Sequence, residues 1–261
     1  MKQETAVVLD HRAFQGDYRI LRLASPGIGP EVLPGQFLEL QVPRLGDRIL
    51  RRPFSIYRAD DEGVTLLYKI VGRGTLAMRD LRPGDPVDLL GPLGHGFPVP
   101  ETDKTPVLVA GGYGSAALYL QAKRAPRKGI AFFGGRTAGD VLLADEFGEL
   151  GWDVRIATDD GSAGTKGLVV DALDPWLDAL PDPTDLELFA CGPNPMLRAL
   201  GERAERRGFT AWLSMDRNMA CGVGACLACV IKRRLPEGGW EWARCCKDGP
   251  VFEAREIVWE D

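Results

Sequence analysis

The sequence predicts a β barrel followed by an α/β domain and a small cysteine-rich region. Short alternating apolar runs fill residues 1–100, strand-like and helical segments alternate over residues 101–210, and five of the six cysteines lie in residues 211–261. A chain of 261 residues, 45% of them hydrophobic, is long enough to bury the cores of two compact domains. These observations define three expected regions with boundaries near residues 100 and 210.

The predicted barrel, residues 1–100, depends on five apolar runs of strand length. Segments such as PGIGP and DDEG separate the runs, because glycine, proline and aspartate favour turn conformations. Short alternating runs joined by such turns are typical of antiparallel β structure. The five runs are AVVLD, YRILRLA, QFLELQV, VTLLYKI and PVDLLG.

The predicted α/β domain, residues 101–210, alternates between two periodicities. Runs such as PVLVAGG and GIAFFGG have the length of buried strands, whereas SAALYLQAKRA and PNPMLRALGERAERRG have helical spacing. This alternation predicts a parallel sheet with helices on both faces. Residues 211–261 show little periodicity, so we expect a region that lacks a core of its own and needs cross-links, such as disulfides or a metal site, to hold it together.

The cysteines of the C-terminal region have the spacing of a metal site. Cys221, Cys226 and Cys229 form C-x4-C-x2-C, and the chain returns at Cys245 and Cys246. Plant-type [2Fe-2S] sites use this spacing, with a fourth thiolate from elsewhere in the chain. The glycines between the first two cysteines suit a loop that turns tightly and directs backbone N–H groups at sulfur. The spacing leaves the fourth ligand open between Cys245 and Cys246.

A zinc site and disulfides are the alternatives to a cluster at these cysteines. Four thiolates also bind structural zinc, but zinc ribbons usually combine two C-x2-C pairs and this chain has one. Disulfides require an oxidising compartment, and the first residues do not resemble an export signal. We therefore expect a cytoplasmic protein with a metal or cluster site.

Two loops predict a nucleotide site in the α/β domain. Gly111, Gly112 and Gly114 follow an apolar run and open a helical segment, the context in which a pyrophosphate binds at a helix N-terminus. Such a turn is also common as a purely structural feature. A second loop, Cys191-Gly192-Pro193, also joins an apolar run to a helix, and open parallel sheets bind ligands at the carboxyl ends of strands. Cys191 is alternatively a small buried apolar residue.

Charge and hydropathy exclude two kinds of partner. The net charge is -5, the pI is about 5.3, and acidic and basic residues are interspersed. Because no basic face is indicated, we expect no nucleic-acid partner. No apolar run reaches the roughly 18 residues of a membrane-spanning helix, so we expect no membrane association.

The run Arg51-Arg-Pro-Phe-Ser-Ile-Tyr57 in the barrel region fits either of two roles. Its arginines suit phosphate and its aromatic residues can face a flavin ring. Composition alone favours the simpler role, which is an exposed strand end with solvated charges. The residues of this run do not decide between the two.

Six segments together resemble a known family. They are RPFS (52–55), LYKIVGRGT (67–75), GPLGHGF (91–97), TDDGS (158–162), MACGVGAC (219–226) and CKDGPVF (246–252). In this order they resemble the electron-transfer subunits of type B dihydroorotate dehydrogenases, within the ferredoxin-NADP reductase superfamily. The resemblance covers essentially the whole chain. It implies that Cys246, which precedes Lys-Asp-Gly-Pro, is the fourth cluster ligand and that Cys245 is an additional thiol.

The resemblance also implies the cofactors, FAD in the barrel and NAD in the α/β domain. Gly135 and Arg136, about 20 residues beyond Gly114, stand where an acidic residue often marks NAD, so they hint at NADP by that general rule. The resemblance implies NAD instead. The residues expected at FAD are Arg52, Pro53, Phe54, Ser55, Leu67, Tyr68, Lys69, Gly74 and Thr75, the last two at its pyrophosphate.

The implied function is electron transfer in pyrimidine (UMP) biosynthesis. Electrons are expected to pass from a catalytic dihydroorotate dehydrogenase subunit through the cluster and FAD to NAD+, in a heterotetramer. No residue of this chain is expected to act as a general acid or base. One alternative is an NAD(P)H-dependent subunit of a sulfhydrogenase-like or ferredoxin-linked complex. Another is a zinc-stapled binding module without enzymatic activity.

Overall fold

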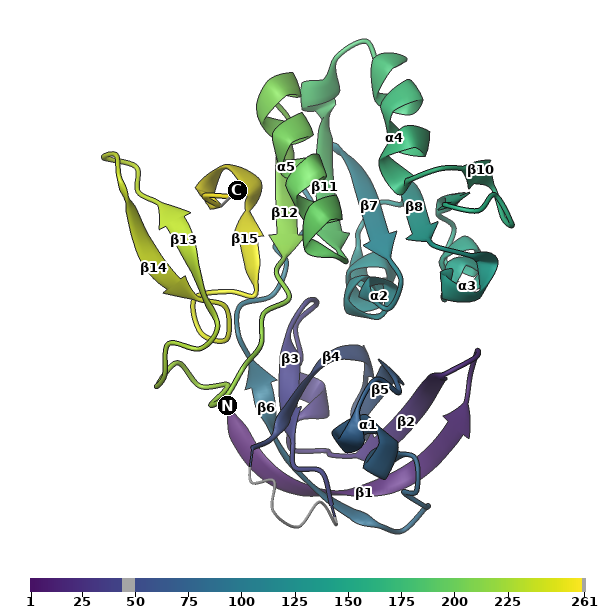
Figure 1. Cartoon of the computed structure of the whole chain (residues 1–261), viewed down its shortest axis with the longest axis vertical. Coiled ribbons are helices and arrows are strands. Elements are labelled where there is room, and N and C mark those ends of the chain that lie inside the picture. The colour runs from purple at the N-terminus through teal and green to yellow at the C-terminus, as the bar shows by residue number, and fades with distance from the viewer. Residues whose placement is uncertain (44–49, 260–261) are drawn as a thin grey trace.

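The computed structural model describes residues 1–43 and 50–259 of the chain. It contains a closed barrel, a mostly parallel sheet covered by helices, and a separate two-stranded hairpin near the C-terminal end (Figure 1). The fold class predicted from the sequence is therefore confirmed. Among the described residues, no helix is long and apolar enough to cross a membrane.

Six strands form the barrel, in the order β1-β2-β5-β4-β3-β6, and each runs antiparallel to its neighbours. Five of them lie on the predicted apolar runs. The sixth, β4, contains the Arg-Pro-Phe-Ser segment, where charged residues hide the strand pattern. The bounds are β1 (Lys2–Ala13), β2 (Tyr18–Ala24), β3 (Phe37–Leu40), β4 (Arg52–Ala59), β5 (Gly63–Lys69) and β6 (Pro86–Leu93), with helix α1 (Arg73–Met78) after β5.

Strand β3 has both faces buried. Leu38 and Leu40 point into the barrel core, where they pack with apolar residues of the other strands. Because side chains alternate along a strand, Phe37 and Glu39 lie on the outer face. Both are buried, at 3% and 1% exposure, so other parts of the chain cover the barrel here.

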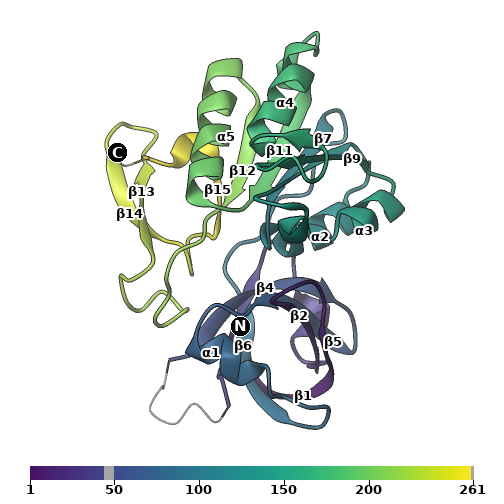
Figure 2. The ribbon, with the colours of Figure 1, turned by 45° about the vertical axis from the view of Figure 1, so that its right-hand side comes forward.

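The second sheet has the order β10-β9-β8-β7-β11-β12-β15, and all its pairs are parallel except β12 with β15. Helices α2 and α3 cover the face toward the barrel, and α4 and α5 cover the other face (Figure 2). The bounds are β7 (Thr105–Gly111), α2 (Gly114–Arg124), β8 (Ile130–Gly135), α3 (Ala144–Glu149), β9 (Asp153–Thr158), β10 (Thr165–Lys166), α4 (Val169–Asp178), β11 (Leu186–Cys191), α5 (Asn194–Arg207), β12 (Thr210–Ser214) and β15 (Val251–Glu253).

The C-terminal region shares the core of the α/β domain. Strands β13 (Val230–Arg234) and β14 (Trp240–Arg244) pair only with each other, but β15 extends the large sheet. Ile231 of the hairpin and Phe252 of β15 belong to the same apolar cluster as Leu200 of α5. The expectation that this region lacks an independent core agrees with this packing.

A polar cluster joins the barrel to the α/β domain. The Tyr57 hydroxyl on β4 donates a hydrogen bond to Glu146 on α3, and Arg58 forms an ion pair with the same carboxylate. The guanidinium group of Arg58 also lies 4.8 Å from the ring centre of Tyr119 on α2. Burial and the neighbouring Glu146 raise the pKa of Tyr57, so the hydroxyl remains a donor at neutral pH.

We expect Phe189→Ala to destabilise the protein by about 3 to 5 kcal/mol, because it opens a cavity beneath a central strand. Phe189 on β11 is fully buried and packs edge-on against Phe97, with ring centres 5.9 Å apart. Urea unfolding followed by fluorescence measures the change. The control is Val99→Ala, at a side chain 77% exposed. Equal effects of the two substitutions would contradict the packing described here.

Candidate functional site

The first cavity, of about 630 Å³, lies where the barrel meets the α/β domain and the segment after β12. Its volume is typical of a ligand site. Residues of the barrel form one wall, and the wall opposite them includes Tyr113, Cys191 and residues 214–219. All nine residues that the family resemblance assigns to FAD line this cavity: Arg52, Pro53, Phe54, Ser55, Leu67, Tyr68, Lys69, Gly74 and Thr75.

The turn at one end of this cavity is held by Thr75. Its hydroxyl oxygen accepts hydrogen bonds from the N–H groups of Val71 and Gly72, at 2.9 and 3.2 Å, and the hydroxyl lies 3.1 Å from the Gly72 carbonyl. The Thr75 side chain is therefore occupied in shaping the turn before α1. Gly74 lies beside Arg52, whose Nε would be 3.3 Å from a Cβ at that position.

The second cavity, of about 490 Å³, lies at the carboxyl ends of β7, β8 and β11. Four of the residues that the sequence predicted for a nucleotide site line it: Gly111, Gly112, Gly192 and Pro193. It shares a wall with the first cavity. The shared lining residues are Lys69, Tyr113, Gly192 and Asp216.

Two predicted nucleotide residues lie outside this second cavity. Gly114 does not line either cavity, and a Cβ at this position would lie 2.1 Å from the Cys191 carbonyl oxygen. It therefore allows the start of α2 to pack against the end of β11. Cys191 lines the first cavity rather than the second, and burial raises its pKa to about 12, so its thiol is neutral.

A cluster of charges spans the two cavities and was not predicted from the sequence. Asp140 accepts hydrogen bonds from Tyr18 Oη and Arg136 Nε, at 3.2 and 3.0 Å, and lies 3.5 Å from Lys69 Nζ. Burial raises the pKa of Asp140, but these partners outweigh it and hold the pKa below its ordinary value. The Arg136 guanidinium is therefore engaged by a carboxylate. Asp159, at the end of β9, lines the second cavity with it.

Some of these residues could have been found from the sequence. Arg136 and Asp159 each follow a strand of the parallel sheet, so the rule that located the glycine loops also applies to them. Residues 214–219 follow β12, another parallel strand of that sheet, so the same rule applies to them. Tyr18 carries no such signal, because it lies on the barrel and reaches the second cavity only through the packing of distant segments.

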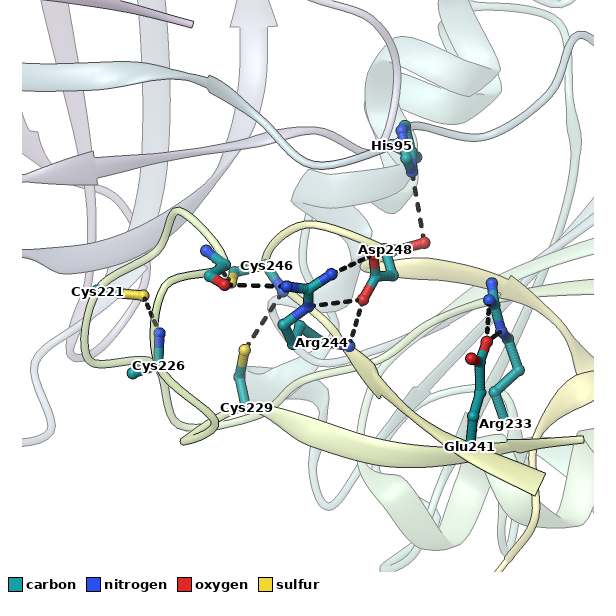
Figure 3. Close-up of polar contacts among 10 residues, drawn as sticks. His95, Cys221, Cys226, Cys229, Arg233, Glu241, Arg244, Cys246 and Asp248 are labelled. Carbon is teal, nitrogen blue, oxygen red and sulfur yellow. Dashed lines mark hydrogen bonds and ion pairs between the residues drawn. The ribbon is translucent and has the colours of Figure 1, made fainter.

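The cysteine loop directs backbone N–H groups at its own sulfurs. Cys226 N–H donates to Cys221 Sγ at 3.4 Å, and Cys246 N–H lies 3.5 Å from Cys229 Sγ. Gly224 N–H donates to Cys246 Sγ at 3.1 Å. Such N–H groups stabilise thiolates. Cys221, Cys226, Cys229 and Cys246 are thus brought together around one loop (Figure 3).

The loop depends on a glycine at position 222. Gly222 has a φ of +67°, and a Cβ there would lie 2.5 Å from Glu39 Oε1 on β3 of the barrel. Any side chain would therefore strain the backbone and collide with the barrel. The close packing of Gly222 against β3 holds the cysteine loop beside the first cavity.

The ion pair between Arg244 and Asp248 stabilises the cysteine loop through a hydrogen bond to Gly224. Arg244 Nη1 donates to the Gly224 carbonyl at 3.1 Å, while Nε and Nη2 donate to the Asp248 carboxylate at 2.9 and 3.1 Å (Figure 3). Asp248 also accepts from the Arg244 backbone N–H at 2.8 Å. Gly224, which donates to Cys246, is therefore fixed by a charged pair.

The adjacent cysteines 245 and 246 have different surroundings. Both are buried in the apolar core of the α/β domain, but Cys246 Sγ accepts a hydrogen bond from Gly224 of the loop. Burial raises the pKa of both thiols to about 12. Burial also raises the pKa of Cys221, but N–H groups of the loop outweigh it and lower the pKa to about 6. Cys221 is therefore largely a thiolate at neutral pH.

The loop residues fit a two-iron cluster. Four thiols, three N–H donors and a glycine turn match what such clusters use, with two thiolates at each iron. Within residues 1–43 and 50–259, no three Cys, His, Asp or Glu side chains converge on one point as a single metal ion requires.

Comparison with known proteins identifies the family. Residues 216–258 match the sequence model of the iron-sulfur cluster binding domain of dihydroorotate dehydrogenase B. The chain is also 39% identical, over 265 residues and 99% of both chains, to the dihydroorotate dehydrogenase B (NAD(+)) electron transfer subunit of Geobacillus sp. (strain WCH70). The chain belongs to this family. The corresponding subunit of Geobacillus kaustophilus (strain HTA426) is 41% identical over 235 residues, 86% of each chain.

A solved structure supports the same architecture. A chain of the NADH-dependent reduced ferredoxin-NADP oxidoreductase, described for flavin-based electron bifurcation, has a TM-score of 0.83 and 29% identity. The match covers 98% of this chain and 90% of that chain. The family expected from the six sequence segments is thus confirmed, and the iron-sulfur match favours a cluster over the zinc alternative.

We expect Arg244→Gln to weaken cluster binding by about 10- to 100-fold, as is typical when a residue that supports a metal ligand is removed. The reason is the loss of the hydrogen bond that fixes Gly224. Iron and sulfide per purified chain, together with visible absorption, measure the effect. Arg234→Gln, at an exposed position on the same hairpin, is the control. Full cluster content in the Arg244 variant would show that the loop does not need this support.

Proposed function

We propose that this chain relays electrons from a dihydroorotate-oxidising catalytic subunit to NAD+, through an iron-sulfur cluster and FAD. The order of the sites supports the proposal. Met219, two residues before the first cysteine of the loop, lines the first cavity, and the first cavity shares four lining residues with the second. The cysteine loop therefore adjoins the first cavity, and the first cavity adjoins the second, which contains the glycine loops.

When bound, FAD and the cluster supply the conversion between one-electron transfer and the hydride that NAD+ accepts. The residues of the chain position these groups. We assign the cluster to Cys221, Cys226, Cys229 and Cys246, and FAD to the nine barrel residues that line the first cavity. No side chain is assigned as a general acid or base.

We assign NAD to the second cavity, at Gly111, Gly112, Gly192 and Pro193. Two observations support NAD over NADP. The names of the family members specify NAD(+), and Arg136, the residue that hints at a 2′-phosphate, is paired with Asp140. Gly114 allows the two loops to pack closely together. Cys191 lines the first cavity, which we assign to FAD.

The relatives are named as electron transfer subunits, which implies a catalytic partner. We propose that the partner is a catalytic dihydroorotate dehydrogenase subunit, that the complex is a heterotetramer, and that it works in the cytoplasm in pyrimidine synthesis. The division into an FAD-binding part (1–100), an NAD-binding part (101–210) and a cluster-binding part (211–261) belongs to the same proposal.

A second candidate is a subunit of a ferredoxin-linked oxidoreductase. The similarity to the NADH-dependent reduced ferredoxin-NADP oxidoreductase, over 98% of this chain, favours it. The identity of 29% to that chain is lower than the 39% to the dihydroorotate dehydrogenase B subunit. Only the partner distinguishes the two candidates, since both use a flavin and a nicotinamide nucleotide.

We expect NAD+ to be reduced by dihydroorotate only when this chain and the catalytic subunit are both present. The reason is that the proposal places dihydroorotate oxidation on the catalytic subunit and electron transfer to NAD+ on this chain. NADH formation, followed by absorbance, measures the reaction. The chain alone should pass electrons from NADH to an artificial acceptor. If it does so but gives no partner-dependent NAD+ reduction, the pyrimidine role is wrong and the flavoprotein assignment stands.

We expect Cys246→Ser to lose the cluster and Cys245→Ser to retain it, because only Cys246 Sγ faces the loop. The [2Fe-2S] signal in electron paramagnetic resonance of the reduced protein measures cluster content. Flavin absorption serves as an internal check that each variant is folded. Retention by the Cys246 variant and loss by the Cys245 variant would reverse the ligand assignment.

A further inference from the structure

Glu39 is a buried carboxylate with no role in the electron transfer proposed above. It is 1% exposed, and neither of its carboxylate oxygens has a hydrogen-bond partner among the described residues. Burying a carboxylate without a partner is costly, so such a group is uncommon in a folded protein. The location of Glu39 gives a reason for its presence.

Glu39 lies between the first cavity and the cysteine loop. On β3 it shares the outer face with Phe37, which lines the cavity, and its cross-strand neighbour is Pro53, which also lines it. On the other side, its Oε1 would be 2.5 Å from a Cβ at Gly222. Gly222 follows Cys221 directly, so the carboxylate adjoins the loop proposed to hold the cluster.

The charges around Glu39 do not neutralise it by direct contact. Arg51 is paired with Asp88 at 2.5 Å and donates to the Asp88 carbonyl at 3.1 Å. Arg52 Nη1 donates to the backbone carbonyls of Leu50 and Arg51. Both arginines therefore form their hydrogen bonds with other groups, and neither bonds to the Glu39 carboxylate. The negative charge of Glu39 can therefore act on the cysteine loop.

We propose that Glu39 sets the redox potential of the cluster: its carboxylate, enclosed between the first cavity and Gly222, lowers the midpoint potential and favours electron transfer to the flavin. This inference rests on the proposed function, because it requires the cluster and FAD in the assigned sites. The step it affects moves one electron from the reduced cluster to the flavin and makes or breaks no bond. A nearby negative charge disfavours the reduced cluster, which carries one more negative charge.

The ionisation of Glu39 decides the pH at which the proposal is tested. Burial raises the pKa of Glu39 to about 7, while Arg51 and Arg52 oppose the rise and Cys221 adds to it. The carboxylate is therefore charged at alkaline pH. Its folded-state pKa lies above the ordinary value of a carboxyl group, so ionisation at high pH destabilises the fold.

The test is a redox titration of the cluster in the full chain with its bound cofactors, followed by electron paramagnetic resonance at alkaline pH. We expect Glu39→Gln and Glu39→Met to raise the midpoint potential, shifting the one-electron equilibrium about tenfold or more, or about 59 mV for tenfold. Glu39→Asp, which keeps the charge, should stay near the wild-type potential. Glu39→Met should also raise the melting temperature at alkaline pH, because it removes a buried charge.

The matched control is Glu187→Gln. Glu187 is also buried, at 2% exposure, but it accepts hydrogen bonds from Trp212 Nε1 and the Glu101 N–H and does not adjoin the loop. Its substitution should leave the cluster potential unchanged. A wild-type potential in Glu39→Gln and Glu39→Met would overturn the proposal, as would loss of the cluster in both, which makes Glu39 a structural support. A wild-type chain that holds neither cluster nor flavin would instead refute the proposed function.

Discussion

The pairing of β15 with β12 fixes the geometry on which the candidate sites depend. Trp212, Leu213 and Ser214 pair antiparallel with residues 251–253, and Met215 N–H continues the pattern by donating to the Pro250 carbonyl at 2.9 Å. Residues 215–220 connect β12 to the cysteine loop, and residues 247–250 connect Cys246 to β15. Because these two connecting segments end on paired strands at one edge of the sheet, the pairing sets the position of the loop relative to the first cavity.

The features that the sequence predicted are those that depend on local spacing. Three cysteines in one loop, and glycines between a strand and a helix, carry their chemistry within about ten residues. Strand β4 was less evident, because its charged and cavity-lining residues interrupt the alternation that marks a strand. The family resemblance, rather than periodicity, pointed to its importance.

The features that the sequence could not predict arise where distant segments meet. In the run FLEL, alternation suggests that Glu39 is an ordinary outward-facing residue of a barrel strand. It is buried because the cysteine loop, far along the chain, covers that face. Tyr18 and Asp140 similarly meet only because the tip of the barrel contacts the α/β domain. Propensity and periodicity contain no information on such contacts.

The shared construction of the first cavity has a consequence for how the protein matures. Its barrel wall is complete once the first hundred residues have folded, but Pro250 and residues 214–219 close the opposite side. During synthesis the barrel wall therefore emerges first with this face open, and enclosure of the first cavity waits for the β12–β15 pairing. Enclosure of the first cavity and closure of the cysteine loop are thus linked, because both depend on the same pairing of strands near the C-terminal end.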